Sequence, residues 1–276
     1  MDINITGPKI YFTIPIFGGI NITQTTVSLL VVTLVILGAA YAMTRSITKR
    51  PGGRQVIVEK LVTMLTNTVT DTMGAHNKRF VPYIGTLFLC SIIGSLVGMT
   101  QVFRSTTADL SVTLAWALAT VFIVWYSNIR QYGFLGWLKS FTEPIAVMTP
   151  MNIVSEISTP VAMAFRHFGN VAGGSVLMTI VYAALAGLNT LVFGWLPEAV
   201  LAVIPPIFQV GIPAVLSVYF DLFSGFIQAF VFSLLSMVYI GMANPPETEQ
   251  TVAQRKQAKQ LKKSKKKNKT NNLEVK

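Results

Sequence analysis

The chain has 276 residues, of which 52% are hydrophobic and 12% are charged. A soluble domain carries about 25% charged residues, so this composition argues against a soluble enzyme. The formal net charge of +11 would suit a nucleic-acid-binding protein, but ten of the 22 basic residues lie in 255–276 and the rest of the chain is close to neutral. We therefore expect an integral membrane protein with a basic tail and no nucleic-acid partner.

The first 73 residues predict an extracytoplasmic segment, one span and one surface helix. Residues 1–25 contain glycine and proline breaks and lack the basic start of a signal peptide, so they are expected to be retained outside the membrane. Residues 26–43 carry no charge and are just long enough to cross about 30 Å of hydrocarbon as a helix. In 55–73, apolar residues recur every three or four positions, which predicts an amphipathic helix lying on the membrane surface.

Further along the chain, apolar runs of spanning length continue. Residues 80–103 and 110–126 predict the second and third spans. The stretch 128–150 contains charged residues and a proline, which predicts an exposed loop with Trp137 at the membrane interface. Two apolar regions follow, 152–193 and 199–242, and each is too long for one upright helix, so tilt or a break is expected.

These elements predict an all-α integral membrane protein with five transmembrane helices and one amphipathic surface helix, in a membrane domain covering 26–244. Residues 245–276 lack apolar periodicity and are expected to form a disordered basic tail that contacts anionic lipid. With five crossings, 44–79, 128–150 and 243–276 share one side and hold nineteen of the 22 basic residues. Because basic loops stay in the cytoplasm, we expect the C-terminus there and the N-terminus outside, in a bacterial plasma membrane.

Arg166 is the candidate functional residue that stands out, because it lies between apolar stretches of the fourth span. A charge at the centre of a spanning helix costs about 2.5 to more than 10 kcal/mol, depending on the method of estimate. We expect a fixed positive charge on an ion path; the alternative is an arginine that snorkels to the interface or pairs structurally. Asn170 is one helical turn further and shares its face, and the nearby glycines would let another helix approach closely.

The last span carries a second polar set. Asp221 and Gln228 are seven residues apart, which predicts one face of a helix and a separation of about 10 Å along the axis. With the predicted orientation, Glu156 lies on the cytoplasmic side of Arg166, and Asn170 and Ser175 lie on its external side. Asp221 lies on the external side of Gln228. This is the layout of two half-paths that meet at one charge. The alternative for Asp221 is a counter-ion that neutralises Arg166.

The residue composition argues against disulfides, metal binding and ATP hydrolysis. A single cysteine, Cys90, and two histidines do not supply a disulfide framework or a metal site. The sequence contains no phosphate-binding loop. We therefore expect no cofactor and no ATP hydrolysis by this chain itself.

Three runs carry a resemblance to a known family. FRHFGNVAGG at 165–174 resembles the signature of subunit a of rotary F-type ATP synthases, in which an essential arginine precedes a Phe-Gly-Asn triplet. IQAFVFSLLSMVYIGMA at 227–243 is similar to the last helix of that family, and ADLSVTLAWAL at 108–118 is similar to its third-span motif. The resemblance covers most of residues 10–244.

The resemblance implies a non-catalytic stator subunit whose two half-channels load and unload protons or Na⁺ on carboxylates of a rotor c-ring. Its other implied partners are the peripheral-stalk subunit b and the soluble F1 head. By position, Arg166 would face the rotor carboxylate, Asn170 and Gln228 would line the external half-channel, and Glu156 would lie near the cytoplasmic one. Many bacterial relatives have glutamate where this chain has Ser175, and histidine or glutamate is usual at Asp221. We therefore expect the external path to depend more on Asp221 and water.

Two other functions remain open from the residues. A solute permease could use Arg166 to bind an anionic substrate, and it would act without a rotor ring. A non-conducting membrane anchor could use its basic tail to recruit a soluble partner, but an anchor has no need of Arg166, Asp221 and Gln228 at one depth.

Overall fold

The computed structural model describes residues 9–15, 19–45, 47–48, 52–100, 103–142, 145–193, 211, 215–216 and 218–246. Contacts divide the chain into the units Met1–Ala243 and Asn244–Lys276. The helices and strands of the described residues all belong to the first unit. Most of the predicted basic tail and the first part of the 199–242 region lie outside the described residues.

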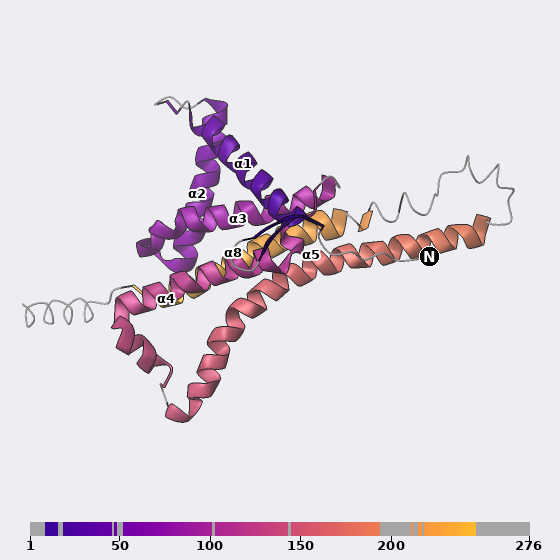
Figure 1. Ribbon diagram of the computed structural model, residues 1–276. Helices are drawn as coiled ribbons and strands as arrows, with labels where there is room; N and C mark the ends of the chain where they lie inside the picture. Colours follow the sequence, from indigo (N-terminus) through magenta and orange to yellow (C-terminus); the bar gives the residue numbers. More distant parts are fainter. Residues whose placement is uncertain are drawn as a thin grey trace, which may run out of the picture. The chain divides into compact units, whose positions relative to one another are not determined.

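Helices dominate the described residues (Figure 1). The α-helices are α1 Gln24–Thr44, α2 Gly53–Met73, α3 Val81–Leu96, α4 Leu110–Ser140, α5 Thr149–Phe193 and α8 Gly225–Ala243. The shorter helices are η1 Ala75–Phe80, η2 Val97–Thr100, η3 Thr106–Ala108, η4 Ala146–Met148 and the π-helical η5 Val218–Ser224. In the described part, five stretches are long and apolar enough to cross a membrane, namely 24–44, 75–96, 110–140, 149–193 and 222–243. The predicted all-α membrane fold with five spans is confirmed, and α2 is a helix outside those five.

A short antiparallel hairpin precedes the first span. Strands β1 (Ile10–Ile14) and β2 (Ile20–Thr23) pair with Ile14 opposite Ile20. Gly19 has a φ of 98°, a conformation that glycine adopts without steric cost. Thr23 ends β2 and caps α1 by accepting a hydrogen bond from the backbone N–H of Thr26. The prediction for 1–25 named no strands, so this hairpin is an addition to it.

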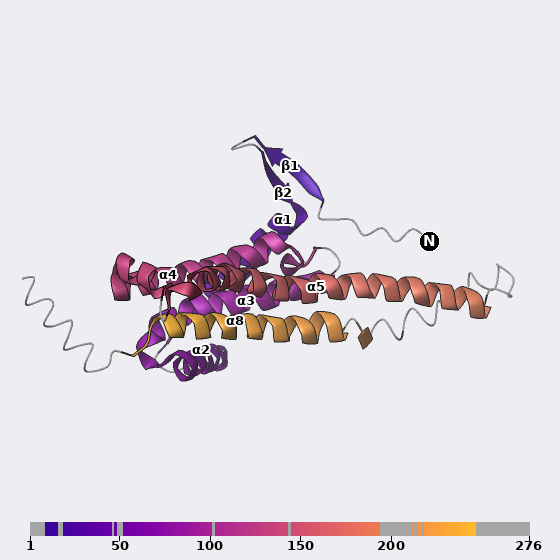
Figure 2. The same cartoon turned by 90° about the horizontal axis from the view of Figure 1, so that it is seen from below.

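Helix α8 packs against four of the other α-helices. It contacts α2, α3, α4 and α5, and Figure 2 shows it lying alongside α3 and α5. One buried cluster joins α8 to α2 and α3 and consists of Val69, Met73, Ile84, Met237 and Ile240. A second joins α8 to α3, α4 and α5 and consists of Leu87, Ala117, Met163, Ala164 and Phe232. The second cluster includes residues of α5 that closely precede Arg166.

Small and hydroxyl side chains pack α3 tightly against η3. The Oγ of Ser105 donates to the carbonyl of Gly94 over 3.1 Å, and the hydroxyls of Ser95 and Thr107 are 2.9 Å apart. A Cβ atom on Gly94 would collide with the Oγ1 of Thr106, which is fully buried. Close approach of these elements therefore requires glycine at position 94.

Gly94→Ala is expected to destabilise the subunit by about 1–3 kcal/mol, the usual cost of adding an atom to a well-packed interior. Thermal unfolding in detergent measures this change. Gly38→Ala is the control, because nothing lies within 4 Å of its Cβ position. Thr106→Ala removes the atom that collides, so it should restore much of the lost stability in the double variant. A Gly94→Ala protein as stable as the original would contradict the packing argument.

The structure corrects the prediction of a loop over 128–150. Helix α4 continues to Ser140, with a kink at Gly133, whose φ of 77° and ψ of 164° are not helical. The ring centroids of Trp125 and Trp137 are 6.1 Å apart, whereas twelve residues of straight helix span about 18 Å. The chain therefore folds back at Gly133, because an aromatic cluster around Trp137 favours packing over an extended loop.

Of the two outcomes expected for 152–193, tilt or a break, the break does not occur, since α5 is one helix of 45 residues that includes Pro160. At 1.5 Å per residue its length is about 67 Å, roughly twice the thickness of the hydrocarbon core. That α5 tilts in the membrane stays a prediction.

Candidate functional site

Arg166 lies on the exposed face of α5. Asn170 is also exposed and is turned from Arg166 by only about 40° in an ideal helix. The buried face of α5 is centred about 100° around the helix from Arg166 and consists of Pro160, Met163, Ala164, His167, Gly174 and Met178. His167 directly follows Arg166, and the turn of about 100° between them separates the two faces. The structure thus confirms the predicted shared face of Arg166 and Asn170.

Two glycines without side chains lie on the helix surface beside Arg166. Gly169 and Gly173 are both exposed, and no heavy atom lies within 4 Å of the position that a Cβ would take at either residue. Both positions lie within about 60° of Arg166 around the helix. The guanidinium therefore stands beside a smooth strip that another helix could approach closely.

Glu156 lies ten residues before Arg166, about 15 Å away along the axis of α5. It is half-buried, and its Oε1 accepts a hydrogen bond of 2.5 Å from the indole Nε1 of Trp125 on α4. A bond to an ionised acceptor is stronger than one between neutral groups. The contact holds the carboxylate at the α4–α5 interface, and Trp125 is a partner that the sequence alone did not predict.

Gln228 lies on α8 beside the segment of α5 that holds Arg166. It is half-buried and directly precedes the buried Ala229, and a Cβ atom added at Gly225 one turn earlier would lie 3.2 Å from the Cβ of Ser95 on α3. The backbone of Gln228 is close enough to His167 to interact with the imidazole. Arg166 and Gln228 are therefore brought to a similar level, on adjacent helices.

The structure changes the predicted relation between Asp221 and Gln228. Asp221 lies in the π-helical stretch Val218–Ser224, and the α-helix begins only at Gly225. Because a π-helix turns by a different angle per residue from an α-helix, a spacing of seven no longer places both residues on one face. π-Helical turns often occur at functional sites. The side chain of Asp221 lies outside the described part of the structure.

Ser175 is nine residues beyond Arg166, which turns the helix by about 180° in ideal geometry. Its hydroxyl is exposed and donates to the carbonyl of Ala172, 2.7 Å away. Ser175 therefore lies on a different face of α5 from Arg166 and Asn170. Its predicted place on the external path stays a prediction.

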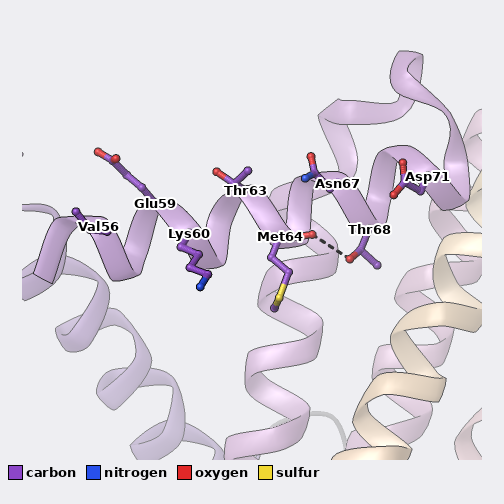
Figure 3. Close-up of a pocket in the computed structure, with 8 residues that line it drawn as sticks. All are labelled: Val56, Glu59, Lys60, Thr63, Met64, Asn67, Thr68 and Asp71. Atoms are coloured by element: carbon purple, nitrogen blue, oxygen red, sulfur yellow. Dashed lines mark hydrogen bonds between the residues drawn. The ribbon is translucent and has the colours of Figure 1, made fainter. Parts of the chain in front are cut away.

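A shallow depression runs along α2, separate from these residues (Figure 3). Its lining combines a hydrophobic edge with charges of both signs, and consists of Val56, Glu59, Lys60, Thr63, Met64, Asn67, Thr68 and Asp71. None of the six predicted site residues contributes to this lining. Among the described residues no group of three or more His, Cys, Asp or Glu side chains is arranged to hold a metal ion.

Comparison with known proteins identifies the family. The sequence profile described as "ATP synthase A chain" matches residues 25–241. "ATP synthase subunit a 1" of Crocosphaera subtropica is 33% identical over 223 residues, which are 80% of this chain and 86% of that protein. "ATP synthase subunit a 1" of Hahella chejuensis is 30% identical, covering 87% of this chain and 92% of that protein. "ATP synthase subunit a, sodium ion specific" of Propionigenium modestum is 29% identical, covering 86% and 84%. The profile match covers the first four predicted spans, all but the last residue of the fifth, and the Arg166 motif, so the chain is a multi-pass membrane protein that belongs to the ATP synthase A chain family.

Proposed function

We propose that this chain is the non-catalytic, ion-conducting stator subunit in the membrane sector of a rotary ATP synthase. The observation that carries the proposal is the position of Arg166, exposed on α5 beside Gly169 and Gly173. A guanidinium stays charged at any physiological pH, and leaving it in lipid is costly. A carboxylate on an adjacent rotor helix would supply the opposite charge, and the glycine strip would allow that helix to come close.

The proposed cycle uses Arg166 as a fixed point. A rotor carboxylate arrives neutral, with a bound proton or Na⁺, and gives up that ion as it comes to face the guanidinium. The ion leaves along one half-path, and the empty carboxylate is reloaded from the other as the ring turns. A cation 4 Å from the guanidinium would meet repulsion of about 4 kcal/mol at an effective dielectric constant of 20. Arg166 would therefore prevent direct leakage between the half-paths.

The half-paths are assigned from the groups on either side of Arg166. Glu156, held by Trp125, would serve the cytoplasmic side. Asn170, Gln228 and Asp221 would serve the external side, with Ser175 and water where relatives carry a carboxylate. This assignment assumes that the N-terminus is outside and the C-terminus in the cytoplasm of a bacterial cell.

Partners follow from the same mechanism. The exposed Arg166 face would meet a c-ring, and subunit b would hold this chain against the F1 head. The basic tail would contact anionic lipid and would have no part in ion conduction.

Purification of the full chain from bacterial membranes in mild detergent tests the proposal. We expect a ring of small two-helix subunits and a soluble ATPase to be recovered with it, and the reconstituted complex to take up protons or Na⁺ when ATP is added. A chain that is recovered alone and binds or transports an organic anion would instead support a permease.

A further inference from the structure

His167 is a buried residue of α5 that contacts three neighbouring spans, α3, α4 and α8. Its side chain is 1% exposed. The Nε2 atom lies 3.2 Å from the Oγ of Ser91 on α3. The ring packs edge-on against Trp116 of α4, with centroids 6.4 Å apart, and against Phe232 of α8, with centroids 5.4 Å apart. These contacts form a buried socket around the imidazole.

The hydrophobic effect does not select which face of α5 turns inward. Large apolar side chains occur on the exposed face, as at Ile157, Phe165 and Ile180, as well as on the buried one. In lipid, burying apolar surface gives no driving force between helices, so packing and hydrogen bonds decide the orientation. Among the five spans of the described chain, α5 is also the least buried.

The hydrogen bonds of α5 indicate that His167 determines which face of the helix turns inward. In 157–175, a stretch that the structure describes throughout, His167 is the residue whose side chain hydrogen bonds to another helix. The hydroxyls of Thr159 and Ser175 donate to carbonyls of α5 itself. The Glu156–Trp125 bond also ties α5 to α4, but it lies about 15 Å along the helix axis from Arg166, toward the start of α5.

We infer that His167 is a positioning residue whose socket fixes the rotation of α5 about its axis and hence the direction of Arg166. Turning the helix would withdraw the imidazole from Ser91, leaving buried polar groups without partners, which is costly. Because Arg166 and His167 belong to one continuous helix, any such rotation would carry Arg166 away from the exposed face by the same angle. The consequence for pumping rests on the proposed function of Arg166, whereas the orientation of α5 does not.

The test measures orientation and function separately, in the intact complex. Cysteines replace Ala117 and Ala164, which are fully buried in one cluster on α4 and α5, in a Cys90→Ala background. The yield of cross-linking between them by a short bifunctional thiol reagent reports whether α5 keeps its face toward α4. ATP-driven ion pumping in inverted vesicles is measured in parallel, without the added cysteines.

Four variants are compared. His167→Leu removes the hydrogen bond and keeps an apolar side chain, and Ser91→Ala removes the same bond from the other side. His167→Gln keeps an amide that can reach Ser91. Ser233→Ala is the control, because this buried hydroxyl has no hydrogen-bond partner among the described residues.

We expect His167→Leu and Ser91→Ala to lower both the cross-linking yield and pumping by about fivefold or more, within the range for directly coupled pairs. The double variant should be no worse than His167→Leu alone, and His167→Gln and Ser233→Ala should retain both signals. A lower yield with unchanged pumping would support the positioning role and contradict the function proposed for Arg166. An unchanged yield in both loss variants would overturn the positioning role, whatever pumping does. If His167→Leu does not assemble, Ser91→Ala decides alone, since it removes only a hydroxyl.

Discussion

Replacing Arg166 with alanine is expected to abolish coupled ion pumping while the subunit still folds and assembles. Removing a charge from a membrane span relieves a penalty of about 2.5 kcal/mol or more, so folding should not suffer. The variant would lose both the group that discharges the rotor carboxylate and the repulsion that keeps the half-paths apart. We expect ATP-driven acidification or Na⁺ uptake in inverted vesicles to fall below about 1% of the original rate, equivalent to about 2.7 kcal/mol.

Arg166→Lys is expected to fail almost as completely. Lysine is a compact point charge whose pKa falls when it is buried, whereas the guanidinium stays charged and spreads its charge over a planar fork. Assembly is checked by recovery of the ring and the ATPase head. Arg130→Ala, which removes an exposed arginine of α4, is the control that should pump normally. Substantial coupled pumping by assembled Arg166→Ala would refute the assigned mechanism.

Asp221→Asn is expected to slow ion flux by about tenfold or more, a barrier increase of about 1.4 kcal/mol, if this carboxyl group relays ions from the external side. Asp221→Glu and Asp221→His should retain part of the flux, because both keep an ionisable group. The flux is measured as pumping per assembled complex. Asp71→Asn on α2 is the matched control, since it removes the same charge outside the predicted paths.

The alternative role of Asp221 gives a different result. If it served only to neutralise Arg166, the asparagine variant would yield less folded subunit, and the molecules that did assemble would pump at the original rate. Original flux in assembled Asp221→Asn would therefore exclude the relay.

Most of the helices could be predicted from the positions of apolar and charged residues along the chain. The uncharged stretch at 26–43 predicted α1, and the three-and-four spacing at 55–73 predicted α2, each to within a few residues of the observed ends. The loop predicted for 128–150 was wrong up to Ser140 because charge and proline marked its ends, whereas Trp137 and its aromatic neighbours determined its packing. Such contacts form only because the chain folds back at Gly133, and the spacing of residues does not predict that bend.

The site was predictable where function needs a costly residue. Arg166 stands out in any apolar stretch, and helical spacing then placed Asn170 on its face. The π-helical turn at Asp221 was not predictable, because VYFDLFS contains no glycine, proline or spacing pattern that distinguishes a π-helix from an α-helix. The partners of Glu156 and His167 lie on α4 and α3, 31 and 76 residues away along the chain. Pairings of that kind arise from helix packing and leave no local signal.

The fold-back at Gly133 also links this protein to the thickness of its bilayer. Tryptophan side chains are enriched at the level of the lipid headgroups, so the paired rings of Trp125 and Trp137 are expected to fix the depth of the end of α4 in the membrane. Because Trp125 also holds Glu156, the same rings would determine how far that carboxylate lies from bulk water. Each ångström of mismatch costs only a fraction of a kcal/mol, so lipids of different length can shift this depth without unfolding the bundle. If Glu156 serves the proposed cytoplasmic half-path, ion entry beside it would depend on acyl-chain length, which the cell can adjust without altering the protein.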